Sequence, residues 1–323
     1  LLFAGGVTTS IEAGMAFLDW PLSNGSVNPE GWLDDPHQTA EHSHRLIGAA
    51  LGLLSIALMA WTQWVEPRRW VKHVAVALFV VVCLQGGLGG LRVLYDQLNT
   101  GAQHNLVAQS FAIAHACGAL VVVGLLVVNA AAQSRSWIER RAGLRAPVAP
   151  GIRASGLLAV GLLFTTVLFG AIVRHFGLGP LLTGFPPFVN EAGALLPESW
   201  SWGVTVHFLH RTLGMLAGLA VFVFCCRLYR SPATGPGHAA LCLLAGGLVF
   251  AQIFLGGLVV TTGINNHAAT VHMLTGALLI AISWLLTFLT YRLPLKETAT
   301  QKAPTPLRHA QAETGSGAPT PES

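Results

Sequence analysis

The stretch EHSHRLIG at residues 41–48 decides how the chain is interpreted, because it puts an acid, two imidazoles and a guanidinium at the start of a long apolar run. The pattern returns as HFLHRTLG at residues 207–214, where the second histidine, the arginine and the glycine recur. The first position differs, with Glu41 in one copy and His207 in the other. A polar motif that occurs twice at the edge of an apolar segment predicts an internal repeat.

The composition predicts an all-α integral membrane protein. Of the 323 residues, 53% are hydrophobic and 10% are charged, and the mean hydropathy is +0.59. A soluble domain carries about 25% charged residues, so this chain has too few ionic groups to cover a surface that faces water. The net charge of +4 is small, and nothing in the sequence indicates nucleic-acid binding.

Continuous apolar runs predict eight transmembrane helices, near 1–18, 42–64, 73–94, 104–131, 154–175, 203–228, 238–261 and 267–290. A helix needs about 20 residues to cross the hydrocarbon layer. The runs are continuous rather than alternating, which favours helices over a barrel. The first run is short and no initiator Met precedes it, so we expect part of the first helix to lie before residue 1.

The distribution of Lys and Arg predicts the orientation. The connections 19–40, 95–103, 176–202 and 262–266 contain neither residue, whereas the other connections are basic. The positive-inside rule puts the basic loops in the cytoplasm, together with the tail 291–323, whose composition predicts disorder. Both His-Arg motifs then lie near the outer face of the cell membrane. All five cysteines fall within predicted spans, which excludes a disulfide in the outer loops.

Further matches indicate two tandem four-helix halves. QGGLGGLRV at 85–93 matches QIFLGGLVV at 252–260, and Trp20-Pro21 matches Phe185-Pro186. Residues 1–131 form the first half, 132–153 a basic linker and 154–290 the second half. Because four spans is an even number, we expect a pseudo-two-fold axis along the membrane normal.

The repeat offset of 165–168 residues predicts which histidines are paired. His272 then corresponds to His104, which gives two pairs, His44 with His104 and His210 with His272. Two imidazoles from neighbouring helices at one depth suit the axial positions of a haem iron. Arg45 and Arg211 would be placed to meet the haem propionates, and His207, one turn before His210, could line the same pocket.

Two assignments stay open at this point. His115 is a weaker candidate because it needs an offset of 157, and it is either a second-site ligand or a buried structural histidine. Glu41, one turn before His44, either stabilises positive charge or takes a proton beside the macrocycle. Its alternative role is that of an acidic residue near a helix start, favoured by the helix dipole.

The combination of motifs resembles the haem A synthase family over about residues 1–290. The resemblance is carried by Glu-x-x-His-Arg at 41–45, His-x-x-His-Arg at 207–211, GGLRV at 89–93 and LDWPLSNG at 18–25. Many bacterial members of that family carry a cysteine pair in the first outer loop, and this chain has none.

The resemblance implies an oxidoreductase that converts the C8 methyl group of haem O to a formyl group, giving haem A for cytochrome c oxidase. It implies a haem b cofactor on His210 and His272, and a substrate site with His44 and His104 as ligands and Glu41 as the essential residue. Implied partners are haem O, membrane lipid, an electron donor that the sequence does not identify, and proteins such as haem O synthase and oxidase assembly factors.

Two other functions compete with this interpretation. A b-type cytochrome that passes electrons from quinol would hold two permanent haems and would tolerate Glu41→Gln. A transporter would also have a repeat and eight spans, but it would need polar breaks near the middle of the membrane, and few charges lie there.

Overall fold

The computed structural model describes residues 1–98, 105–139, 146–185 and 196–291. His104, residues 140–145 of the linker and the tail from residue 292 lie outside the described residues. The elements are α1 (Leu2–Ser10), α2 (Pro36–Val65), α3 (Arg69–Leu98), α4 (Leu106–Gln133), α5 (Arg135–Ile138), α6 (Pro150–His175), the 3-10 turn η1 (Gly179–Leu181), α7 (Trp202–Tyr229), α8 (Pro236–Thr261) and α9 (Asn266–Thr290).

Seven of these helices are long and apolar enough to cross a membrane, namely α2, α3, α4, α6, α7, α8 and α9. Their bounds confirm seven of the runs expected from the sequence. The run at 1–18 contains only α1, which ends at Ser10, so an eighth span is not confirmed by the described residues. Glu12, two residues later, has a φ of 58°, and this left-handed backbone cannot continue a right-handed helix.

Proline and small polar residues determine where the long helices begin. Pro36, Pro150 and Pro236 each occupy the first turn, where the missing N–H costs no hydrogen bond. Asp35 caps α2 by accepting a hydrogen bond from the backbone N–H of His37 at 2.8 Å. Since α2 begins at Pro36, Glu41 lies in its second turn rather than at its start. The helix-dipole explanation for Glu41 is thereby weakened.

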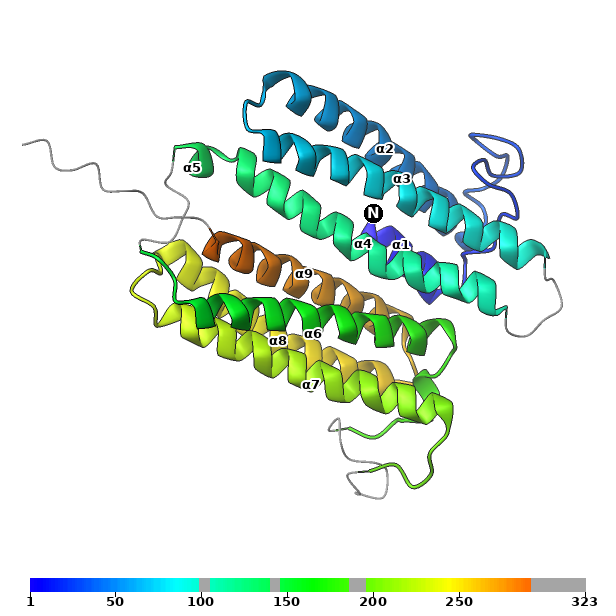
Figure 1. The fold of residues 1–323 in the computed structure, drawn as a ribbon. Coiled ribbons are helices and arrows are strands. Elements are labelled where there is room, and N and C mark those ends of the chain that lie inside the picture. Colours follow the sequence, from blue (N-terminus) through cyan, green and yellow to red (C-terminus); the bar gives the residue numbers. More distant parts are fainter. Residues whose placement is uncertain (99–104, 140–145, 186–195, 292–323) are drawn as a thin grey trace, which may run out of the picture.

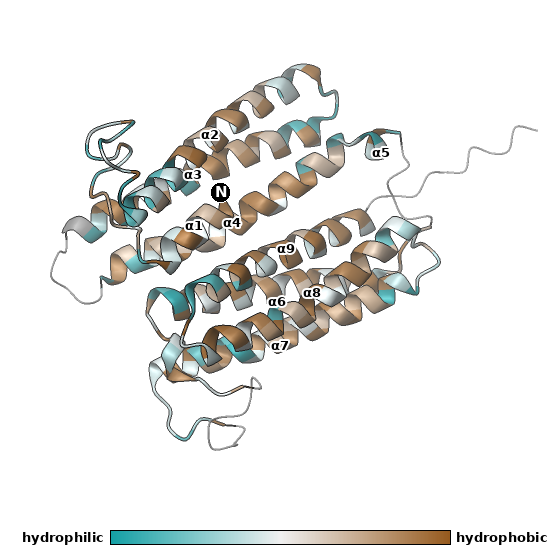
Figure 2. Cartoon of the chain, turned by 180° about the vertical axis from the view of Figure 1, so that it is seen from behind, coloured by the Kyte–Doolittle hydropathy of each residue, from teal (hydrophilic) through white to brown (hydrophobic). Residues whose placement is uncertain are grey.

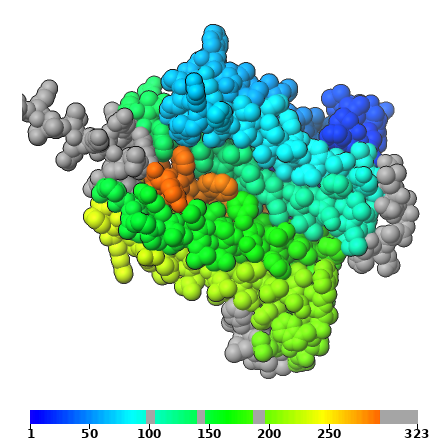
Figure 3. Space-filling model, viewed as in Figure 1, coloured from blue at the N-terminus to red at the C-terminus, as the bar shows by residue number. Residues whose placement is uncertain are grey.

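The helices form two adjacent groups (Figure 1). One contains α1 to α4 and the other α6 to α9, with each helix in contact with the next along the chain. The groups meet through α4 with α9, α4 with α6 and α1 with α9. Trp284 of α9 rests against Gly124 of α4, where an added methyl group would lie 2.7 Å from its ring. In Figure 3 the first group, blue to blue-green, lies directly against the second, green to yellow.

The side-chain distribution is that of a bundle surrounded by lipid. Brown, apolar residues follow the shafts of the helices in Figure 2, and teal residues gather at the ends. Large apolar side chains such as Leu53, Trp64 and Phe250 are exposed, whereas Phe224 and Ile280 are fully buried in the second group. The five cysteines are free and lie within helices, as the sequence predicts. The finding is a multi-pass, all-helical membrane protein.

Candidate functional site

Four histidines share one arrangement, in which each ring rests against a glycine of the preceding long helix or of α1. A methyl group added to the glycine would lie too close to the Cε1 atom of the ring, so the ring occupies space that only glycine leaves open. The pairs, with that distance, are Gly5–His44 at 2.9 Å, Gly89–His115 at 3.3 Å, Gly170–His210 at 2.7 Å and Gly256–His272 at 3.1 Å. The four histidines therefore make the same kind of contact with a glycine.

Among the described histidines, the one that faces His44 is His115, which lies in the third turn of α4 rather than near its start. Their ring centroids are 6.4 Å apart and the ring planes are perpendicular. The alternative His104 lies outside the described residues, and α4 begins only at Leu106. The sequence does contain a signal for His115. AIAHACGAL at 112–120 parallels ATVHMLTGAL at 269–278, with one residue inserted after the histidine of the second segment.

The hydrogen bonds of the rings leave nitrogen atoms available. The Nδ1 atoms of His115 and His210 lie 2.9 Å from the carbonyl oxygen of Gln85 and 3.0 Å from that of Thr166. A carbonyl can only accept, so Nδ1 carries the hydrogen and the Nε2 lone pair is free to bind a metal. The Nδ1 atoms of His44 and His272 are buried and have no partner among the described residues.

The rings of His44 and His115 have the separation expected of two axial ligands of one haem iron. With a metal–nitrogen bond of about 2.0–2.1 Å and a ring centre about 1.1 Å beyond the nitrogen, two imidazoles on opposite sides of one iron have centroids roughly 6.3 Å apart. The centroids of His44 and His115 are 6.4 Å apart. In the other half, the side-chain nitrogen of Gln252 lies 3.3 Å from Nε2 of His272, which is the nitrogen that would bind an iron.

The Glu41 carboxylate is buried and fully engaged. Its Oε2 atom accepts a hydrogen bond from the backbone N–H of Phe17 at 3.0 Å. Its Oε1 atom accepts from Nε of Arg45 at 3.1 Å and pairs with a second guanidinium nitrogen. Only 4% of Glu41 is exposed. Both oxygen atoms of Glu41 therefore have hydrogen-bond donors that the protein itself supplies.

Arg45 and Arg211 both bind outer-loop carbonyl groups. Arg45 donates to the carbonyl oxygen of Asp19 at 2.7 Å and to those of Phe17 and Leu22. Arg211 donates to the carbonyl oxygen of Gly184 at 2.9 Å. Loop carbonyls are thus partners of both arginines, and the propionate contacts expected from the sequence stay a prediction.

Arg211 also donates to the carbonyl oxygen of Leu182 and to His207 Nε2, the latter at 3.4 Å. The Nδ1 atom of His207 lies 3.1 Å from the carbonyl oxygen of Leu178, so this buried ring also belongs to the loop network. Each His-Arg motif therefore ties an outer loop down beside its candidate ligand.

Aromatic residues fix the same loops against glycines. Trp20 packs on Gly90 and Phe185 packs on Gly257, and in each case a methyl group on the glycine would collide with the ring. The two aromatic residues that the repeat matches thus make similar contacts. In the first half the loop is also held by His42, whose Nδ1 lies 2.9 Å from the hydroxyl oxygen of Ser23.

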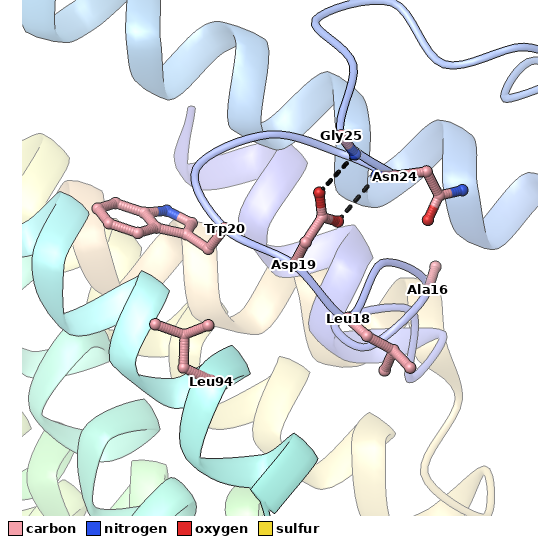
Figure 4. Close-up of a pocket in the computed structure, with 7 residues that line it drawn as sticks. All are labelled: Ala16, Leu18, Asp19, Trp20, Asn24, Gly25 and Leu94. Atoms are coloured by element: carbon pink, nitrogen blue, oxygen red, sulfur yellow. Dashed lines mark hydrogen bonds between the residues drawn. The ribbon is translucent and has the colours of Figure 1, made fainter.

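A hollow lies between the loop that follows α1 and helix α3 (Figure 4). It is lined by Ala16, Leu18, Asp19, Trp20, Asn24, Gly25 and Leu94. Burial opposes the ionisation of Asp19, but hydrogen bonds from the backbone N–H groups of Gly25 and Asn24 outweigh it and lower the pKa of Asp19. We do not assign the haem to this hollow, because none of the glycine-backed histidines lines it.

Comparison with known proteins identifies the family of the chain. The model of the family described as cytochrome oxidase assembly protein matches residues 34–284. The Heme A synthase of Symbiobacterium thermophilum is 33% identical over 223 residues, which covers 68% of each chain. The Heme A synthase of Exiguobacterium sibiricum is 27% identical over 300 residues, covering 90% of each, and that of Sphingopyxis alaskensis is 25% identical over 323 residues, covering 86% of this chain and 84% of its own. The chain therefore belongs to the haem A synthase family of cytochrome oxidase assembly proteins.

Proposed function

We propose that this chain is a haem A synthase, a membrane oxidoreductase that oxidises the C8 methyl group of haem O to a formyl group. The proposal rests on the four glycine-backed histidines. Among the described residues, only the pair that contains His44 has a carboxylate one helical turn away, that of Glu41. A redox protein that only carries electrons needs no such asymmetry.

We assign His210 and His272 to a haem b cofactor and His44 and His115 to the substrate haem. When bound, haem b supplies a route for electrons to the reaction. His115 takes the place that the repeat offset gave to His104. Its support is the 6.4 Å approach to His44 and the contact with Gly89, which is the counterpart of Gly256 beside His272.

Glu41 acts as a fixed negative charge rather than as a proton acceptor. Both of its oxygen atoms accept hydrogen bonds from groups that do not move with the substrate, the Phe17 N–H and the Arg45 guanidinium. A preorganised charge in a site of low dielectric stabilises positive charge that develops on a reacting carbon. Glu41 lies three residues before His44 on α2 and so faces the same side of the helix.

The architecture we propose has two halves, 1–131 and 154–290, related by a pseudo-two-fold axis along the membrane normal. It is supported by the matched contacts Gly5–His44 with Gly170–His210, and Gly90–Trp20 with Gly257–Phe185. The basic loops after α2, α4, α7 and α9 face the cytoplasm under the positive-inside rule. The four histidines then lie in the outer part of the cell membrane.

The test is a chromatographic analysis of haems extracted from cells that make haem O, with and without this protein. We expect haem A only in cells with the protein, and haem O or a hydroxylated haem, with little haem A, in cells that carry Glu41→Gln. Haem A formation that is independent of the protein would refute the proposal. Unchanged haem O in all strains, with two haems b bound per chain, would instead favour a b-type cytochrome.

A further inference from the structure

A haem carries two carboxylates, and a site within the membrane has to compensate their charge. The two arginines of the His-Arg motifs are occupied by loop carbonyls and, for Arg45, by Glu41. Two other arginines near the glycine-backed histidines, Arg92 and Arg174, form no ion pair with a carboxylate. The ion pairs among the described residues are Asp35–His37, Glu41–Arg45 and Glu66–Arg68.

Arg174 lies one helical turn outward from the glycine that supports His210. Gly170 and Arg174 are four residues apart on α6, so they share a face and differ in height by about 6 Å. The guanidinium donates to the hydroxyl oxygen of Ser10 at 2.6 Å, and this hydroxyl is 2.7 Å from that of Thr270. The Nε atom of Arg174 is buried and has no partner among the described residues.

Arg92 is placed similarly in the first half, but on α3, which the repeat matches with α8 rather than with α6. It follows Gly89, which supports His115, by three residues on α3, again about one turn toward the outer end. One guanidinium nitrogen donates to the carbonyl oxygen of Gly14 at 3.2 Å. Asp96 and Glu41 lie close enough to attract Arg92 electrostatically, but neither is within ion-pair distance. Arg174 therefore contacts the last residue of α1, and Arg92 contacts a residue four positions beyond it.

We propose that Arg174 and Arg92 bind the carboxylates of the two haems, Arg174 in the cofactor half and Arg92 in the substrate half. The proposal rests on the function proposed above. A guanidinium held beside an axial ligand, one turn nearer the outer surface, offers a charge-assisted hydrogen bond to a carboxylate on the edge of the macrocycle. Arg174 has only neutral partners among the described residues, and Arg92 forms no ion pair with the nearby Asp96 or Glu41, so each guanidinium can bind such a carboxylate when it arrives.

The test compares haem b with its dimethyl ester, which has the same ring and iron but no carboxylate charge. The full chain is purified without haem from cells starved of porphyrin, and each ligand is titrated while the absorption spectrum is followed. The protein variants are wild type, Arg174→Gln, Arg174→Lys and Arg153→Gln. Arg153 is the control, because it lies at the opposite end of α6 and donates to the Thr290 carbonyl oxygen.

We expect wild type and Arg153→Gln to bind haem b about tenfold or more tightly than the ester. Arg174→Gln should lose most of this preference with its ester affinity unchanged, and Arg174→Lys should keep part of it. Equal weakening of both ligands in Arg174→Gln would overturn the inference, since it would mark a purely structural role. Equal binding of both ligands by wild type would also overturn it and leave the proposed function standing, whereas failure of wild type to bind either ligand would refute both.

Arg92 is tested in the same way on a His272→Ala background, so that only the N-terminal site binds haem. Arg92→Gln should there remove the preference for haem b over the ester. An undiminished preference would overturn the assignment of Arg92.

Discussion

Gly170→Ala should disrupt the cofactor site although it adds one methyl group to a helix. In the structure this methyl group would lie 2.7 Å from Cε1 of His210. Two carbon atoms prefer a separation of about 3.5–4.0 Å, so the ring has to retreat by about 0.8 Å or more. Ligand bonds to a metal tolerate displacements of only about 0.2 Å. The axial bond from His210 is therefore expected to break or to lengthen beyond a low-spin geometry.

The assay is the absorption spectrum of the purified protein, which should show a six-coordinate low-spin haem b in wild type and a loss or high-spin shift in Gly170→Ala. Gly161→Ala is the matched control, because Gly161 is on the same helix, is exposed and has no atom within 4 Å of the added methyl group. Alanine is a better helix former than glycine by about 1 kcal/mol, so weakening of the helix cannot explain a loss.

A wild-type spectrum in Gly170→Ala would refute the argument from close packing. A wild-type spectrum in His210→Ala would refute the assignment of His210 as a ligand of the cofactor haem. Equal loss of the low-spin haem b spectrum in Gly161→Ala and Gly170→Ala would show that α6 tolerates no added methyl group. The loss in Gly170→Ala could then not be attributed to the contact with His210.

Three other perturbations have defined outcomes. Glu41→Gln should fold and retain haem b, but extracts should contain haem O or a hydroxylated haem, with haem A reduced about 10²–10³-fold in rate; wild-type haem A levels would exclude Glu41 from the reaction. Trp20→Ala should loosen the first outer loop and expose position 13, where Ala13 is buried. A cysteine engineered at this position should then react faster with a membrane-impermeant maleimide, and unchanged labelling would contradict this. The hydrogen bond from Arg68 lowers the pKa of Glu66, so its stabilising effect is present at neutral pH and is lost as the pH falls below about 4.5. Wild type should therefore lose more thermal stability between pH 6 and pH 4 than Glu66→Gln, and equal losses would argue against the pair.

Much of the fold follows from the sequence because a membrane span is a long, continuous apolar signal. The seven long helices begin and end within a few residues of the expected runs, except that α2 begins six residues early, at Pro36. The first run contains only the short α1 for a local reason, since apolar composition over 1–18 does not reveal the left-handed backbone at Glu12.

The site was only partly predictable, because a repeat offset is not constant across loops of different length. The offset near 167 holds up to Gly89 and Gly256, but the following connection is longer in the first half, and the offset drops to 157 between His115 and His272. The AxxH segments at 112–115 and 269–272 carry the register that we propose. The partners of Arg45 could not be deduced, because the loop carbonyls it binds belong to irregular backbone with no periodic pattern.

The most direct test of the account is the ratio of haem A to haem O in cells that carry His115→Ala or His104→Ala. If His44 and His115 hold the substrate, His115→Ala should accumulate haem O and form essentially no haem A, while His104→Ala should form substantial haem A. Haem A from His115→Ala at the wild-type ratio, with none from His104→Ala, would contradict the assignment of the substrate site.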